Sequence, residues 1–116
     1  MNKSKYEKIM AERYRIMKET YDNDYIGIEM CCSDMISLIK EDTPGFISFL
    51  KTDCSSQDYL FITEWFEEFV STIKSQELID AFRETMKTRF MKETIEYNIE
   101  QKLNEAIEYC GNGIIH

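Results

Sequence analysis

Apolar residues recur at intervals of three and four along almost the whole chain, and this spacing restricts the fold more than any other feature of the sequence. The pattern is clear between Lys3 and Thr20 and again from Ile28 to Lys40. Only four Gly and one Pro occur among the 116 residues. The one apolar run that resembles a strand, Tyr59 to Ile62, continues in helical spacing through Ile73. The sequence therefore predicts an all-α protein.

Turn and capping residues divide this pattern into helices. Thr43 followed by Pro44 predicts a helix start. A Thr side chain can accept a hydrogen bond from a backbone N–H, and Pro, which has no N–H, gives up no helical hydrogen bond in the first turn. Ser55 with Asp58 resembles a capping box and opens a helix that reaches Ile73. Residues 77–109 are predicted to form either one long bent helix or two abutting ones, and residues 111–116 are predicted to form a helix end with a short extension.

The length and the apolar content together indicate one domain. A chain of 116 residues can close a single hydrophobic core but is too short for two independent ones. Its hydrophobic fraction of 43% and aromatic fraction of 13% are far above those of disordered chains. We therefore expect a single-domain bundle of five or six helices over residues 1–116.

The sequence also indicates a compartment. No uncharged apolar run approaches the roughly 18 residues needed to cross a bilayer, and the N-terminal segment is charged throughout. A cytoplasmic protein is expected. The four cysteines accompany no secretory signal, so they are expected to be reduced thiols of the core; they are Cys31, Cys32, Cys54 and Cys110.

The net charge of −8 is unevenly distributed. Residues 1–20 hold six Lys or Arg against three Glu, whereas residues 21–80 hold thirteen Asp or Glu against three Lys. Residues 81–116 are nearly balanced, with six Glu against five Lys or Arg. Negative charge repels phosphate backbones and anionic lipids, so neither nucleic acid nor membrane is an expected direct ligand. The expected partner is a basic protein, and the oligomeric state stays open.

The residues needed for catalysis and for cofactor binding are scarce. The single histidine, His116, is the last residue, which is a poor position for a general base. The cysteines lack the paired spacing of a zinc site, and no glycine cluster suits a phosphate. Neighbouring carboxylates on one side of a helix, such as Glu64 and Glu67, are the remaining catalytic option. The same pattern of carboxylates occurs on ordinary solvated helix faces. We therefore expect no enzyme activity, no metal and no cofactor.

A candidate binding surface lies in the acidic middle of the chain. Helical spacing places three carboxylates on the polar side of one helix, with two more just upstream, and amphipathic aromatic residues border them. For each aromatic residue, a core position with its polar tip at the surface is the alternative. The predicted carboxylates are Asp53, Asp58, Glu64, Glu67 and Glu68, and the predicted aromatic anchors are Tyr25, Tyr59 and Trp65.

Two adjoining segments, Tyr59 to Ile73 and Leu78 to Ile95, resemble the paired amphipathic helices of acidic, all-helical bacterial immunity proteins. Such proteins are encoded beside polymorphic toxins or toxins of contact-dependent growth inhibition. The resemblance implies a cytoplasmic protein that binds and neutralises a secreted toxin domain, often a basic nuclease, without catalysing a reaction. It assigns no role to an individual residue.

Other readings of the sequence stay open. A phage-type inhibitor or DNA mimic would space its carboxylates like phosphates over a long face and would be displaced by DNA. A helical adaptor would dock a partner helix through an apolar ridge, and salt would strengthen that association. An enzyme would need a buried carboxylate cleft.

Overall fold

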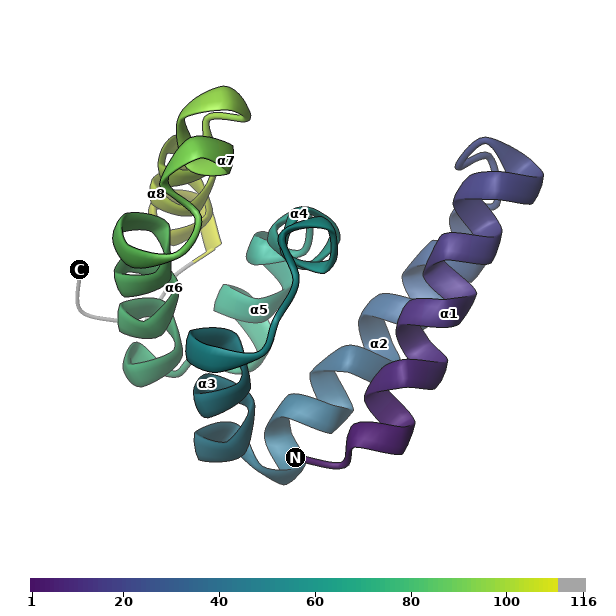
Figure 1. Cartoon of the computed structure of the whole chain (residues 1–116), viewed down its shortest axis with the longest axis horizontal. Helices are drawn as coiled ribbons and strands as arrows, with labels where there is room; N and C mark the ends of the chain where they lie inside the picture. The colour runs from purple at the N-terminus through teal and green to yellow at the C-terminus, as the bar shows by residue number, and fades with distance from the viewer. Residues whose placement is uncertain (111–116) are drawn as a thin grey trace. The chain divides into compact units, whose positions relative to one another are not determined.

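Every regular element in residues 1–110, which are the residues that the computed structural model describes, is a helix (Figure 1). The prediction of an all-α protein is confirmed. The predicted helix count of five or six is wrong, because the described range contains eight helices. They are α1 (Lys3–Thr20), α2 (Tyr25–Glu41), α3 (Thr43–Thr52), α4 (Ser56–Thr63), α5 (Phe66–Thr72), α6 (Gln76–Thr88), α7 (Met91–Glu96) and α8 (Ile99–Cys110).

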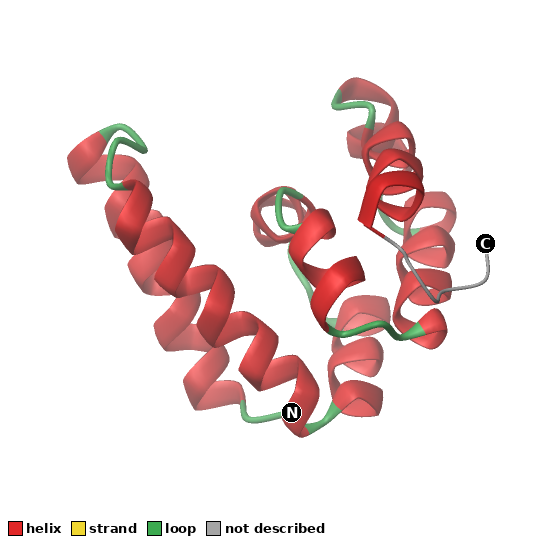
Figure 2. Ribbon diagram, turned by 180° about the vertical axis from the view of Figure 1, so that it is seen from behind, coloured by secondary structure: helices red, strands yellow, loops and turns green. Residues whose placement is uncertain are grey.

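The contacts within the chain divide it into two units, residues 1–43 and the chain from Pro44 onward. Short loops join the helices (Figure 2). The prediction of one domain over residues 1–116 stays a prediction, because two contact units occur both in single domains and in pairs of domains. The predicted helix end and extension at residues 111–116 lie outside the described residues.

The first unit is a hairpin in which α1 and α2 lie side by side (Figures 1 and 2). Asn2 caps α1 by accepting a hydrogen bond from the Lys5 amide at 3.1 Å. Asp24 caps α2 in the same way, with the Gly27 amide as donor at 2.9 Å. The stripes predicted from the sequence supply the buried side chains. These include Tyr6, Ile9, Met10 and Ile16 from α1, and Cys31, Cys32, Met35, Leu38 and Ile39 from α2.

The helix predicted between Ser55 and Ile73 is interrupted at Glu64 and Trp65. The Glu64 and Trp65 amides donate to carbonyls three residues back, at 3.2 and 3.1 Å, which tightens the chain and ends α4. Two apolar ridges run along this segment, and the side chains of both are buried: Tyr59, Ile62, Phe66, Phe69 and Val70 form one, and Phe61 and Trp65 form the other. One continuous helix would present these ridges over too wide an arc for one neighbour, and a change of axis buries both.

The segment predicted as one or two helices over residues 77–109 contains three. The first interruption is at Arg89 and Phe90, where the Phe90 ring is buried and stacks on Tyr59 with ring centroids 4.0 Å apart. The second is at Asn98, whose φ of 56° lies in the left-handed region that Asn tolerates better than most residues. Packing of Phe90 and the backbone conformation of Asn98 therefore end helices that contain no Gly or Pro.

Aromatic side chains form the centre of the second unit. Phe66 meets Phe82 edge to face with centroids 4.9 Å apart. The Tyr59 hydroxyl lies 3.0 Å from Thr85 Oγ1 and 3.3 Å from the Phe82 carbonyl oxygen, so its polar atom is satisfied inside the core. A void of only about 10 Å³ remains between Phe66, Phe82 and Leu103, which holds no more than about one water molecule.

The predicted caps are partly confirmed. Ser55 accepts a hydrogen bond from the Asp58 amide at 3.1 Å, as expected. α3 begins at Thr43, as the Thr43–Pro44 pair predicts, and the Thr43 hydroxyl donates to the Ile39 carbonyl at 2.9 Å, which satisfies a carbonyl at the end of α2. Of the cysteines, Cys31, Cys32 and Cys54 are buried thiols, as expected for core residues, and Cys110 is a half-buried thiol.

Candidate functional site

Of the five predicted carboxylates, three lie at the α4–α5 junction and two lie near the start of α4. Glu64 caps the end of α4, and Glu67 and Glu68 lie in the first turn of α5; all three are exposed. Acidic residues in a first helical turn are stabilised by the helix dipole, so their positions also suit the fold. Asp53 is exposed between α3 and α4, and Asp58 is half-buried in the first turn of α4.

The α4–α5 junction and α8 together form a shallow acidic pocket. It has a volume of about 240 Å³, and a third carboxylate, Glu105 of α8, joins Glu64 and Glu67 in its lining. Lys102 is the one cationic side chain of the lining. We call this the acidic pocket, and its lining residues are Thr63, Glu64, Phe66, Glu67, Lys102 and Glu105.

The interruption of the helix at Trp65 positions the acidic pocket. Glu64 belongs to the end of α4 and Glu67 to the start of α5, so the two carboxylates sit on either side of the change of axis. On α8, Gln101 Nε2 donates to Glu105 Oε1 at 2.9 Å and orients that carboxylate. Three carboxylates against one ammonium group give the pocket a local negative potential, which attracts cationic side chains.

The structure gathers only part of the predicted site. Glu64 and Glu67 line the acidic pocket, whereas Glu68, Asp53 and Asp58 lie outside its lining. Glu105 and Lys102 were not predicted. The only signal in the sequence was their spacing of three residues, which places both side chains on the same side of α8.

The predicted aromatic anchors differ in exposure. The Tyr59 and Trp65 residues are 0% and 4% exposed, which corrects the predicted surface role in favour of the core alternative. Tyr25, in the first turn of α2 and in the other unit, is 71% exposed. Of the three, Tyr25 therefore presents its ring to solvent.

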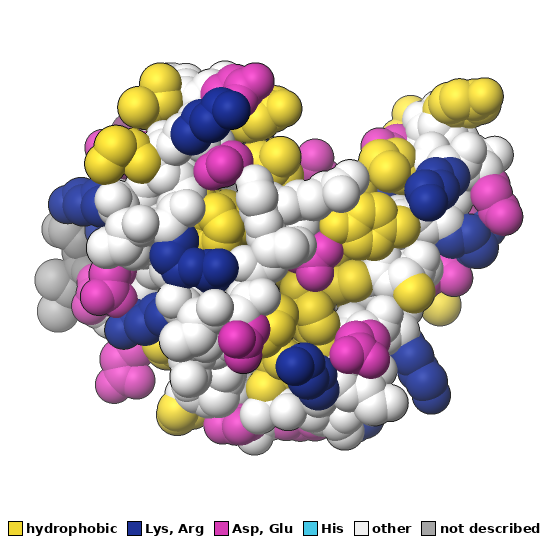
Figure 3. Space-filling view, viewed as in Figure 1, with side chains coloured by type: hydrophobic (Ala, Val, Ile, Leu, Met, Phe, Trp, Pro, Cys, Tyr) yellow, Lys and Arg dark blue, Asp and Glu magenta, His cyan; other side chains and the backbone are white. Residues whose placement is uncertain are grey.

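Three of the six basic residues of α1 have carboxylate partners close by. Lys5 Nζ lies 3.1 Å from Glu41, and Arg13 lies 2.6 Å from Asp22. Arg15 pairs with two glutamates of its own helix, one of which is 2.7 Å away. On the face shown in Figure 3, acidic and basic side chains are interspersed. The acidic pocket is therefore a local cluster of negative charge and not part of a uniformly acidic face.

Residues 1–110 contain no group of three or more His, Cys, Asp or Glu arranged to hold a metal ion. Within the same range, every helix is too short or too polar to cross a bilayer. Two larger depressions, of about 310 and 420 Å³, mix both signs of charge in their linings.

No family model, curated protein or solved structure matches the chain.

Proposed function

We propose that this chain is a non-enzymatic inhibitor of the immunity-protein type, which binds a basic toxin domain, such as a nuclease, in the cytoplasm of a bacterium. The observation that carries the proposal is the convergence of Glu64, Glu67 and Glu105 in the acidic pocket. A toxin that cleaves nucleic acid needs cationic side chains to hold phosphates. The acidic pocket would accept one or more of these side chains and so compete with the substrate.

The size of the acidic pocket suits an anchor side chain rather than a whole substrate. A volume of about 240 Å³ is below the usual range for small-molecule sites, which begins near 300 Å³. An Arg or Lys side chain fits such a depression, with its stem against Phe66 and its charge among the carboxylates. Charge complementarity of this kind supplies fast association and partner selectivity. A DNA mimic is less favoured, because Lys102 interrupts the run of negative charge.

The test is charge reversal at the acidic pocket. The probe is the purified product of the gene adjacent to this one, titrated against the full chain by calorimetry at low and moderate salt. The variant Glu64→Lys/Glu67→Lys should weaken binding by at least about tenfold, which is 1.4 kcal/mol, and should reduce the salt dependence of the dissociation constant.

The matched control is Glu96→Lys/Glu108→Lys, which makes the same change in net charge. Both control residues are exposed and lie near helix C-terminal ends, where Lys is tolerated. Equal weakening by the two double variants would show that net charge alone acts and would refute the acidic pocket as the binding site. Protection of cells that co-express the adjacent gene product should be lost with the first variant and kept with the second.

A further inference from the structure

The short helix α7 has its apolar side chains on the outside. None of its residues is buried, and its two apolar residues, Met91 and Ile95, are 57% and 76% exposed. Its two half-buried residues, Glu93 and Thr94, are polar. An amphipathic helix of a monomeric protein normally shows the opposite arrangement, with its apolar side against the body of the protein. Apolar side chains also stand at the surface over this part of the second unit in Figure 3.

The side of α7 that faces α6 and α8 is poorly satisfied. The Glu93 Oε2 and Thr94 Oγ1 atoms are buried, and neither has a hydrogen-bond partner among the described residues. Burying a polar atom without a partner costs free energy, and exposing Met91 and Ile95 leaves apolar surface in water. The orientation of α7 is therefore unfavourable on both sides in a single copy of the chain, and covering its outer side would offset part of this cost.

The charges beside the apolar side chains indicate what could cover them. Lys92 and Glu96 are four residues apart, so they lie together on α7, next to Met91 and Ile95. Both are exposed, and neither forms an ion pair with another described residue. The outer side of α7 thus carries a positive charge near its start and a negative charge at its end. This pattern is complementary to a second copy of the same helix that runs in the opposite direction.

We propose that α7 is the contact surface of a homodimer in which two copies of the helix pack antiparallel. A twofold axis near Thr94 places Lys92 of each copy opposite Glu96 of the other and brings the two Ile95 side chains together at the centre. Met91 of each copy then meets the Tyr97 ring of the other, which is 47% exposed. The surface is separate from the acidic pocket, whose lining contains no residue of α7.

The area of this surface predicts a weak dimer. The five side chains from Met91, Lys92, Ile95, Glu96 and Tyr97 present on the order of 500 Å² per copy, against about 800 Å² per partner in a standard stable interface. Association should therefore develop between about 10 μM and about 1 mM protein. Titrations at lower concentrations concern the monomer, so Glu96→Lys stays valid as part of the control for the acidic pocket.

Sedimentation velocity of the full chain from about 10 μM to about 1 mM tests the proposal. The expected result is a reversible equilibrium between monomer and dimer. Ile95→Lys places two ammonium groups beside each other at the axis, so it should weaken association at least about tenfold. Ile26→Lys is the matched control, because Ile26 is 73% exposed in the first unit, and it should leave association unchanged. Thermal unfolding checks that both variants keep the fold.

Two single charge changes test the antiparallel geometry. Lys92→Glu places carboxylates opposite each other in its own dimer, and Glu96→Lys does the same with ammonium groups, so each variant alone should associate at least about threefold more weakly. An equimolar mixture of the two variants restores both pairs of opposite charge and should associate as tightly as the wild type. Lys3→Glu and Glu108→Lys make the same changes in net charge at exposed positions outside α7, and they should behave like the wild type alone and mixed.

A chain that stays monomeric up to about 1 mM would overturn the proposal, and so would equal weakening by Ile95→Lys and Ile26→Lys. Weak association of the mixed charge variants would refute the antiparallel pairing. Binding of phosphatidylcholine vesicles that Ile95→Lys abolishes, without self-association, would assign the surface to a lipid instead. These measurements contain no second protein, so none of their outcomes bears on the acidic pocket.

Discussion

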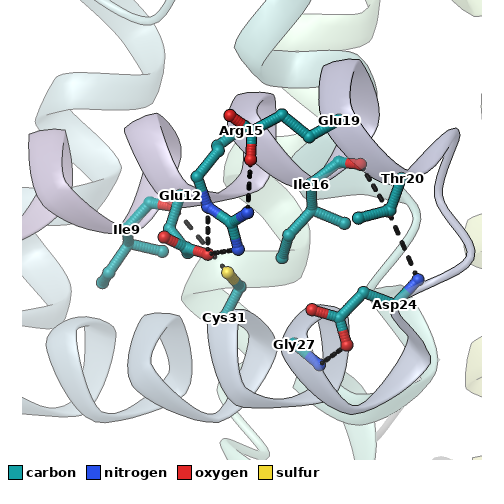
Figure 4. A network of polar contacts seen from close by, with 9 residues as sticks. All are labelled: Ile9, Glu12, Arg15, Ile16, Glu19, Thr20, Asp24, Gly27 and Cys31. Carbon is teal, nitrogen blue, oxygen red and sulfur yellow. Dashed lines mark hydrogen bonds and ion pairs between the residues drawn. The ribbon is translucent and has the colours of Figure 1, made fainter.

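Gly27 lies where α2 packs against Ile16 of α1 (Figure 4). Replacing Gly27 by Ala separates two effects on stability that usually act together, namely helix propensity and the packing of the side chain. A Cβ at this position would lie 2.9 Å from Ile16 Cδ1 and closer still to the Asp24 carboxylate that caps α2. Since contacts under 3.0 Å are not tolerated, both side chains must move. The substitution therefore sets helix propensity against packing and capping.

The magnitudes favour destabilisation. Ala is preferred over Gly within a helix by about 1 kcal/mol, and less in the first turn, where Gly27 lies. Displacing Asp24 from the Gly27 amide costs about 1 kcal/mol, and overpacking against Ile16 costs roughly 1–3 kcal/mol. The net expectation is a loss of about 1–3 kcal/mol in the free energy of unfolding, and each 1 kcal/mol should lower Tm by roughly 4–6 °C in a chain of 116 residues.

Urea denaturation followed by far-UV circular dichroism measures this loss. Gly45→Ala in α3 is the control, and it should be neutral or stabilising by up to about 1 kcal/mol, because helix propensity favours it. Ile16→Val removes the Cδ1 atom that meets the new Cβ, so it should be less destabilising in the Gly27→Ala background than alone. Stabilisation by Gly27→Ala, or strict additivity of the two changes, would refute the packing argument.

Four further predictions concern buried polar groups and their partners. Tyr59→Phe removes two buried hydrogen bonds and should cost about 1–2 kcal/mol; no change in urea denaturation would contradict it. Burial raises the pKa of Tyr59 from near 10 to about 12, so the stability of the wild type should fall by roughly 2–3 kcal/mol as the pH rises from about 10 to about 12, and Tyr59→Phe should lack this decline. Burial also raises the pKa of the Cys31 thiol, so mass-mapped alkylation should modify half-buried Cys110 well before Cys31. Asp22→Asn removes a carboxylate 2.6 Å from the buried guanidinium of Arg13 and should cost about 1–2 kcal/mol in urea denaturation, at the lower end because Asp22 is 44% exposed.

Local periodicity predicted the helices that are long and have one apolar side. The prediction for α1 matches the observed helix at both ends, Lys3 and Thr20. It missed the interruption at Trp65, because the spacing of apolar residues continues across it without a change of phase. The break follows from the need to bury two ridges at once, which is a property of the neighbouring helices and not of the segment itself.

The candidate site was likewise predictable only where it depends on a local pattern. Glu64 and Glu67 were predicted because they lie on the polar side of a local pattern. Glu105 comes from a helix about forty residues further along, and nothing in a single sequence pairs it with them. The aromatic residues were harder to place, because Tyr and Trp are amphipathic and the sequence does not show whether a hydroxyl is satisfied inside, as that of Tyr59 is by Thr85.

Three of the connections between helices enter the left-handed region of backbone conformation without glycine. Tyr21 and Asp22 after α1, Lys74 after α5 and Asn98 after α7 all have positive φ. Each of these residues has fewer accessible backbone conformations than Gly, so these corners should resist bending even though the conformation is unfavourable locally. Glycine at Lys74 or Asn98 would relieve that local cost and at the same time give the corner the freedom of a hinge.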